Sequence, residues 1–405
     1  MIHRVLLLFC SILIISSFCS AQWEQLTNFS SGQVYCFASK GTTLYSGGYV
    51  YLAVSTDSGT TWNSASTGIA GYNPISAIAV GNSFMVAGMY GTSYRSTDNG
   101  ANWIEGKVGL PSTSTWTLFG MNDYVVIHDT IYAVTEEGNT NEDVFRSVDS
   151  GKTWSAVGFG SYTAKKITAL GGNLFVSTQD NGIYKGTYVG SPYNSWQWTH
   201  SFAGGWNVAI IGNILVTSGA NGTYTSADTG TTWTKVSSKL ISGPLIASGK
   251  NLFWCGYSGD SFASTDTGAT WTDIGLVYGA RSAYVFGNYL FAGTSSAMYR
   301  YALTGNLTGV HETEYFTPST FYLKDNYPNP FNPSTNVDFS IPKASFVTLK
   351  VYDVLGREIA TLVNENLQQG QHSVSVNLNS AQSGVYYYRL QAGNNVETKK
   401  MLLMK

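Results

Sequence analysis

Apolar and polar residues alternate along most of this chain in short runs, and many runs come in pairs joined by a tight turn. In Ile75–Gly88 and Val208–Gly219, a Gly-Asn pair separates two alternating segments. Period-two alternation predicts β-strands, and Gly-Asn supplies the positive φ angles of a two-residue hairpin turn. Such pairs predict seven hairpins, near residues 34–47, 75–88, 124–135, 167–178, 208–218, 245–256 and 282–293.

One eight-residue phrase, Ser-x-Asp-x-Gly-x-(Thr/Asn)-Trp, follows the hairpins at intervals of about 40 residues, a period typical of repeat architectures. The five copies carry Asp57, Asp98, Asp149, Asp228 and Asp266. One interval is about twice as long, and a degenerate copy, Gly182–Gly186 followed by Trp198, falls within it. Each repeat is therefore expected to hold a hairpin of strands a and b, strand c, the phrase as the c–d turn, and strand d beginning near the Trp.

Six Trp-led fourth strands follow the seven hairpins, so one outer strand is missing. Trp23–Leu26, near the start of the mature chain, is expected to supply it beside the strand near Met298–Tyr301. Such closure removes an open seam between the first and last repeats. The predicted fold is all-β, with a seven-bladed β-propeller over residues 22–305.

The phrase resembles the Asp-box, or BNR repeat, of sialidases and other secreted propellers, and all its fixed positions are filled in five copies. Its role is expected to be structural. The Asp accepts hydrogen bonds from backbone N–H groups of its own turn, the Gly takes a backbone shape that other residues resist, and the Trp buries its ring between blades. Five equivalent Asp residues spread around a ring cannot converge on one site, so no metal site is predicted.

The first 21 residues read as a secretory signal peptide. His3 and Arg4 precede an apolar run from Val5 to Ile15, and small residues follow it. The run is too short to span a bilayer, and no later stretch is apolar enough to do so. Cys36 and Cys255 remain in the mature chain, in non-adjacent repeats, so buried thiols are expected rather than a disulfide.

The repeat stops after Gly305, and residues 306–325 are expected to form a linker. Residues 326–405 contain short alternating segments that favour a small immunoglobulin-like β-sandwich. The strands are expected at Val337–Ile341, Val347–Val351, Ser373–Leu378, Tyr386–Leu390 and Lys400–Leu403.

Three phrases of this segment, Tyr327–Thr335, Val351–Val363 and Ser383–Gly393, closely resemble the type A C-terminal sorting domain of the type IX secretion system. The resemblance implies that residues 326–405 engage the secretion machinery. It also implies that the chain travels through the periplasm to the cell surface or extracellular space of a Gram-negative bacterium.

Charge and topology indicate where a ligand would bind. Charged residues are 11% of the chain and the formal net charge is −2, so the chain lacks the basic surface that binds nucleic acid.

The a–b and c–d turns share one face of a propeller, here called the turn face, and the b–c and d–a loops share the opposite one, the loop face. Exposed aromatic rings on the loop face suit a carbohydrate or protein ligand, and no cofactor is predicted. The predicted ligand-binding residues are Trp116, Trp206, Tyr72, Tyr90, Tyr257 and Arg281.

Catalysis has little support in the sequence. A sialidase needs three arginines that converge on one site. Arg95, Arg146 and Arg300 instead occupy the same position in three different repeats, beside the phrase, so they do not converge. The alternative is a secreted glycan-acting hydrolase of a sialidase-like propeller type, with Glu136 and Asp180 from neighbouring blades as its carboxylate pair. The sequence favours a binding protein without catalysis and leaves the ligand open.

Overall fold

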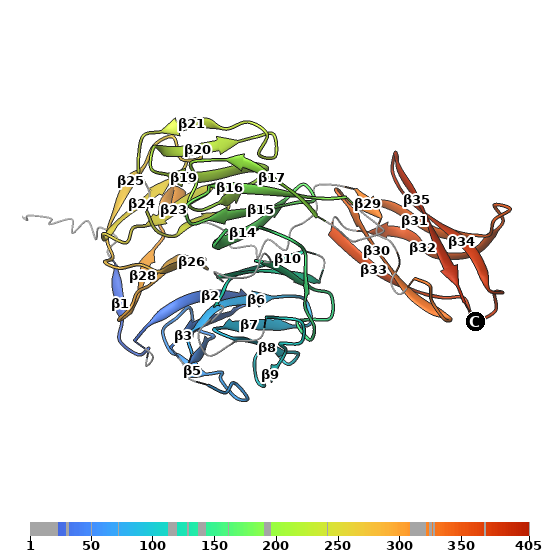
Figure 1. Ribbon diagram of the computed structural model, residues 1–405, viewed down its shortest axis with the longest axis horizontal. Coiled ribbons are helices and arrows are strands. Elements are labelled where there is room, and N and C mark those ends of the chain that lie inside the picture. Colours follow the sequence, from blue (N-terminus) through green and yellow to red (C-terminus); the bar gives the residue numbers. More distant parts are fainter. Residues whose placement is uncertain are drawn as a thin grey trace, which may run out of the picture.

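A computed structural model shows an almost entirely β-structured chain (Figure 1). It describes residues 23–29, 32–49, 51–71, 73–111, 120–127, 129–136, 143–160, 162–189, 196–240, 242–307, 321–323, 326, 329–367 and 370–404. The signal peptide predicted for residues 1–21 lies outside them. Within these ranges the one helix is the short 3₁₀ turn η1 (Gly305–Leu307), and no helix is long and apolar enough to cross a membrane.

The described residues between 24 and 302 form seven four-stranded antiparallel sheets. The first strands are β2 (Val34–Lys40), β6 (Ile75–Val80), β10 (Gly120–Ile127), β14 (Ala164–Leu170), β18 (Ala209–Ile211), β22 (Leu245–Ser248) and β26 (Ser282–Phe286). The second strands are β3 (Thr43–Gly48), β7 (Met85–Met89), β11 (Thr130–Glu136), β15 (Asn173–Thr178), β19 (Ile214–Gly219), β23 (Asn251–Cys255) and β27 (Tyr289–Gly293). The third strands are β4 (Leu52–Ser55), β8 (Thr92–Ser96), β12 (Val144–Ser147), β16 (Ile183–Tyr188), β20 (Gly222–Ser226), β24 (Asp260–Ser264) and β28 (Met298–Ala302). The fourth strands are β5 (Asn63–Ser64), β9 (Ile104–Glu105), β13 (Ser155–Ala156), β17 (Trp196–Phe202), β21 (Thr234–Ser237), β25 (Thr272–Leu276) and, for the last sheet, β1 (Glu24–Leu26).

All seven predicted hairpins occur, but one has a different turn. Gly212 and Gly287 have φ angles of 53° and 57°, as two-residue turns require. After β6 the predicted Gly-Asn turn is wrong, because β7 begins only at Met85 and the loop spans Gly81–Phe84. Phe84 is only 1% exposed, and its carbonyl accepts a hydrogen bond from Gly81 N at 2.9 Å. Burying that aromatic ring fixes the longer loop.

The N-terminal strand completes the last sheet, as predicted. Glu24, Gln25 and Leu26 pair with Arg300, Tyr299 and Met298 of β28. The first strands of successive sheets contact one another, and β26 contacts β2, so the sheets follow one another in a ring. Ser282 Oγ donates to the carbonyl of Val34 at 3.3 Å, which links the last sheet to the first.

Side chains at the start of several first strands make equivalent links to the next sheet. Ser76 Oγ donates to the carbonyl of Met121, and Asn122 Nδ2 donates to that of Ala164 at 2.7 Å. These bonds join the sheets at the loop face. Further from the axis, adjacent sheets share apolar clusters, and the repeated Trp packs in or against them: Trp103 and Trp154 are buried, while Trp62, Trp233 and Trp271 are partly buried. Trp103, for example, lies in one cluster with buried residues of the first and second sheets.

Cys36 and Cys255 are free and buried, as expected. Cys255 is fully buried in an apolar cluster between the sixth and seventh sheets. Burial raises the pKa of both thiols to about 12, which keeps them protonated and unreactive.

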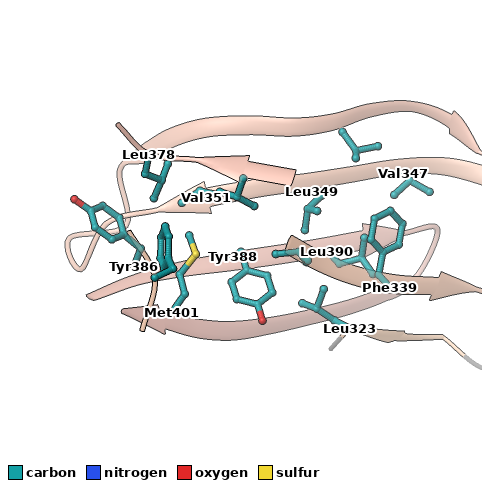
Figure 2. Packing of buried hydrophobic residues seen from close by; sticks show 14 of the residues in the cluster. Leu323, Phe339, Val347, Leu349, Val351, Leu378, Tyr386, Tyr388, Leu390 and Met401 are labelled. Carbon is teal, nitrogen blue, oxygen red and sulfur yellow. The ribbon is translucent and has the colours of Figure 1, made fainter. Parts of the chain in front are cut away.

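The C-terminal residues form two further sheets that enclose a single core. One sheet has the order β29 (Tyr322–Leu323), β30 (Ser334–Ile341), β33 (Gly370–Asn377), and the other the order β32 (Glu358–Leu367), β31 (Ser345–Tyr352), β34 (Gly384–Ala392), β35 (Asn395–Leu403). Figure 2 shows the core between them, where Phe339 of one sheet lies near Val347 and Leu390 of the other.

Two details of this region differ from the prediction. Tyr322 and Leu323 pair with β30, although a linker was expected there, because two residues are too few to show alternation. Strand β32 was not predicted as a strand. Its polar residues, including Glu365 and Asn366, are exposed at a sheet edge and hide the period-two pattern.

Candidate functional site

The five predicted Asp-bearing turns, here called the aspartate turns, share one hydrogen-bond pattern. In the second sheet, Asp98 Oδ1 accepts from Asn102 N at 2.9 Å, and Oδ2 accepts from Asn102 Nδ2 at 2.8 Å. These bonds, together with one from the Ser96 hydroxyl, lower the pKa of Asp98 to about 2. The pKa values of the other four aspartates are lowered as well. Each carboxylate is therefore occupied in holding its own turn.

The Ser of the phrase has a role that the sequence did not reveal. Ser96 is 2% exposed, and its Oγ donates to Asp98 Oδ1 at 2.7 Å while it accepts from Gly100 N at 2.9 Å. The equivalent serines of the other four turns make the same two bonds. One buried hydroxyl thus joins the two sides of each turn.

The residue before the Gly adopts an unusual backbone shape. Asn99 and Gly100 both have positive φ, 58° and 82°, and the same pair of left-handed residues recurs in the other four turns. Left-handed non-Gly residues are uncommon, and here the bonds to the Ser and Asp compensate for the strain. No group of three or more His, Cys, Asp or Glu side chains able to hold a metal occurs in the described ranges.

The first strands surround a cavity of about 1180 Å³. Its lining runs from Gly81, Asn82 and Asp129 at the turn face to Asp180 and Tyr257 at the loop face. The cavity therefore extends along the axis of the ring of sheets.

Four residues singled out in the sequence line the loop-face end of this cavity. They are Asp180, Trp206, Tyr257 and Arg281, and together they are called the mouth below. Trp206 and Tyr257 remain 43% and 59% exposed. Main-chain bonds hold their loops, from Trp206 N to the Ser218 carbonyl at 2.8 Å and from Tyr257 N to the Ser242 carbonyl at 3.1 Å. The backbone of both residues is thus held in place, and both rings have surface available to a ligand.

The remaining predicted residues are placed differently. Tyr90 does not line the cavity in the described part of the chain; it is half-buried, and its carbonyl accepts from Asn73 Nδ2 at 3.1 Å. Trp116 and Tyr72 lie outside the described residues. Glu136 ends strand β11, but its side chain also lies outside the description, so the alternative pair of Glu136 with Asp180 stays a prediction.

Arg281 is the cation of the mouth. Its guanidinium lies 5.6 Å from the centre of the Tyr35 ring, and its backbone N donates to the Gly293 carbonyl at 2.7 Å. It makes no ion pair with any residue in the described ranges. The three other arginines of the repeats, Arg95, Arg146 and Arg300, lie on third strands, as their repeat position predicted.

The wall also contains an ion pair between the third and fourth sheets. Lys166 Nζ lies 3.5 Å from Asp123 Oδ1, and Asp123 Oδ2 accepts from Ile167 N at 3.1 Å. Asp123 therefore neutralises one lysine and joins β10 to β14. These residues were missed because they lie inside alternating strands, where the sequence pattern suggested structural positions.

A β-bulge interrupts the start of the first strand in four consecutive sheets, and the extra residue lines the cavity each time. The register shifts in the pairings of β2, β6, β10 and β14, but not in those of β18, β22 or β26. The extra residues are Tyr35, Ser76, Asn122 and Lys165. Because a bulge re-aims a side chain, it places ring, hydroxyl, amide and ammonium groups on one half of the wall.

Comparison with known proteins identifies the tail. Residues 325–404 match the family model described as the secretion system C-terminal sorting domain. A sorting domain of the type IX system at this position indicates export to the cell surface or extracellular space. No curated protein matches the chain.

Solved structures show the propeller-like fold. An ancestral GH74 enzyme has a TM-score of 0.55 at 15% identity, over 67% of this chain and 48% of its own. YCF48 bound to D1 peptide has a TM-score of 0.54 at 15% identity, over 71% and 98%. PorZ, an essential surface component of the type IX secretion system of Porphyromonas gingivalis, has a TM-score of 0.50 at 12% identity, over 93% and 60%. This chain thus spans about half of the GH74 enzyme and less than two thirds of PorZ.

Proposed function

We propose that this protein is an exported β-propeller that binds a glycan or protein ligand at the mouth and does not catalyse a reaction. The seven sheets are its blades, and the five aspartate turns are Asp-boxes that stabilise them. Residues 1–21 direct export to the periplasm, and the immunoglobulin-like residues 326–405 engage the type IX secretion machinery. The mature protein then acts at the cell surface or in the extracellular space.

One observation carries the ligand proposal: an axial cavity opens between two exposed aromatic rings, Trp206 and Tyr257, and a guanidinium without an ion pair in the described ranges. Concave sites that combine fixed rings with a few polar groups are typical of ligand binding. Trp116 and Tyr72, on loops of the same face, are part of the proposed site, whereas Tyr90 is left out because it does not line the cavity. The aspartate turns lie at the other face and contribute only stability.

The hydrolase alternative has less support. It requires Glu136 to approach Asp180 across neighbouring blades. Asp123 also lines the cavity, but its carboxylate is already paired with Lys166. The GH74 similarity concerns the fold. YCF48, whose structure contains a peptide, is an example of a similar fold with a bound ligand.

The test uses the full mature chain on glycan and peptide arrays, followed by affinity measurement on the hits. Replacing Trp206 and Tyr257 together by Ala is expected to lower affinity about tenfold or more, because each substitution removes a stacking contact worth about 0.5–1.5 kcal/mol. Tyr188→Ala, at an exposed ring away from the cavity, is the matched control. Unchanged affinity of the double variant, or turnover of an arrayed glycan that Asp180→Asn abolishes, would overturn the proposal.

A further inference from the structure

The four mouth residues come from consecutive sheets of the ring, in a fixed order. Asp180 lies on the loop between β15 and β16 of the fourth sheet, and Trp206 precedes β18 of the fifth. Tyr257 lies between β23 and β24 of the sixth sheet, and Arg281 precedes β26 of the seventh. Because β14, β18, β22 and β26 are neighbours, a carboxylate, two aromatic rings and a guanidinium follow one another along one arc of the cavity entrance.

The carboxylate at one end of this arc is held out toward solvent. Asp180 is exposed, and its side chain makes no hydrogen bond or ion pair with any described residue. Its loop is fixed from within, because the buried Thr178 Oγ1 donates to the Gly182 carbonyl at 2.9 Å and accepts from Asn181 N at 3.1 Å. Both oxygens of Asp180 are therefore available to donors of a ligand, on a loop that is already ordered.

The guanidinium at the other end of the arc is presented in a similar way. Ala280, which precedes Arg281, is fully buried, and Arg281 N donates to the Gly293 carbonyl at 2.7 Å. The Tyr35 ring, 5.6 Å away, covers a face of the guanidinium and leaves its edge open. In the described part of the chain, nothing accepts a hydrogen bond from that edge. Two parallel N–H groups can therefore bind one carboxylate or sulfate of a ligand.

The lining at the entrance favours a sugar over an apolar peptide side chain. Apart from Pro244, the described side chains at the loop-face end are aromatic or polar. Besides the mouth residues they are Tyr35, Ser76, Asn122, Lys165, Gln179 and Ser242. Aliphatic side chains such as Ile78, Val125 and Ile246 each lie two residues before the end of a first strand, nearer the turn face. A sugar offers a C–H face to an aromatic ring and hydroxyls to polar groups, whereas an apolar side chain needs an aliphatic pocket.

We infer that the ligand is an acidic oligosaccharide that places a carboxylate or sulfate on Arg281 and hydroxyl groups on Asp180. The inference rests on the proposed function and narrows its ligand to one class. Between the two charged ends, sugar faces stack on Trp206 and Tyr257. Arg281 selects the acidic unit, and Asp180 repels a second acidic group at its own end of the arc. The two charges together set which ligand binds and in which direction it lies.

The test uses an array of uronate-containing and sulfated oligosaccharides, each printed beside its carboxyl-reduced or desulfated form. For residues 22–405, the acidic form is expected to bind at least about tenfold more tightly than the neutral form, as expected for a charge-assisted hydrogen bond. Arg281→Ala should bring this ratio close to one, and Arg146→Ala, on a third strand, should leave it unchanged. Asp180→Asn should weaken both forms alike, because they share the hydroxyls that Asp180 accepts from.

The outcomes separate this inference from the proposed function. Neutral glycans or peptides that bind in preference to acidic glycans, and lose affinity in the Trp206 and Tyr257 double variant, would overturn the inference and leave the proposed function intact. An acidic-to-neutral ratio that persists in Arg281→Ala, or no binding to any printed acidic glycan, would also overturn it. Binding of any ligand with no loss in the double variant would overturn both.

Discussion

The aspartate turns give the sharpest test of the energetics, through Ser96→Ala. Ser96 is 2% exposed, and its hydroxyl bonds to both Gly100 N and Asp98 Oδ1. Its removal leaves the buried N–H of Gly100 without an acceptor, which costs about 1–3 kcal/mol. In a domain of this size each kcal/mol lowers the melting temperature by roughly 2 °C, so a decrease of about 2–6 °C is expected.

Thermal unfolding of residues 22–405 provides the assay, and Ser83→Ala is the control. Ser83 is an exposed loop residue of the same sheet, and the same chemical change there should alter stability by less than about 0.5 kcal/mol. The pKa of Asp98 should also rise in Ser96→Ala, which carboxyl-carbon chemical shifts can follow. Equal melting temperatures for the two variants would refute the assignment of a structural bond to this hydroxyl.

Three further predictions concern the whole chain. The pKa values of Asp57 and Asp98 are lowered to about 2, chiefly by side-chain hydrogen bonds from Thr61 and Asn102. Their contribution to stability should therefore be complete above about pH 4 and lost as the pH falls toward 2. Denaturant unfolding across this range measures the free energy of unfolding, and Asp98→Asn should make it depend less on pH. Deletion of residues 22–27 should lower the melting temperature by several degrees, since Leu26 is buried and burying a Leu is worth about 1.5–3 kcal/mol; an unchanged value would contradict ring closure by β1. Deletion of residues 326–405 should leave a folded propeller in the periplasm, and surface exposure of that variant in the native host would contradict the sorting role.

The repeat was readable from the sequence because its signals are local. Turn residues such as Gly212 and Gly287, and strand alternation, act within a few residues. The partner of Glu24 could be predicted as well, although it lies far along the chain, because a count of strands left one place empty.

The cavity wall could not be predicted in the same way. A bulge at Lys165 or Tyr35 depends on how the strand meets its neighbours and leaves no mark in the alternation. The ion pair of Asp123 with Lys166 joins two sheets, so neither residue alone indicates it. By contrast, Trp206 could be singled out because it departs from the repeat, and departures from a repeat are visible in sequence.

The pairing of β1 with β28 also sets the order of events during biogenesis. The partners Glu24 and Arg300 are 276 residues apart, and closing so long a loop costs about 5 kcal/mol of chain entropy, so we expect this contact to form late in folding. Synthesis proceeds from the N-terminus, and the sorting segment, residues 325–404, emerges after β28. Every chain that carries this address therefore also contains β28, the strand with which β1 pairs. A chain interrupted before β28 keeps β1 but lacks both its partner strand and the address, so it can neither close the ring nor use this export route.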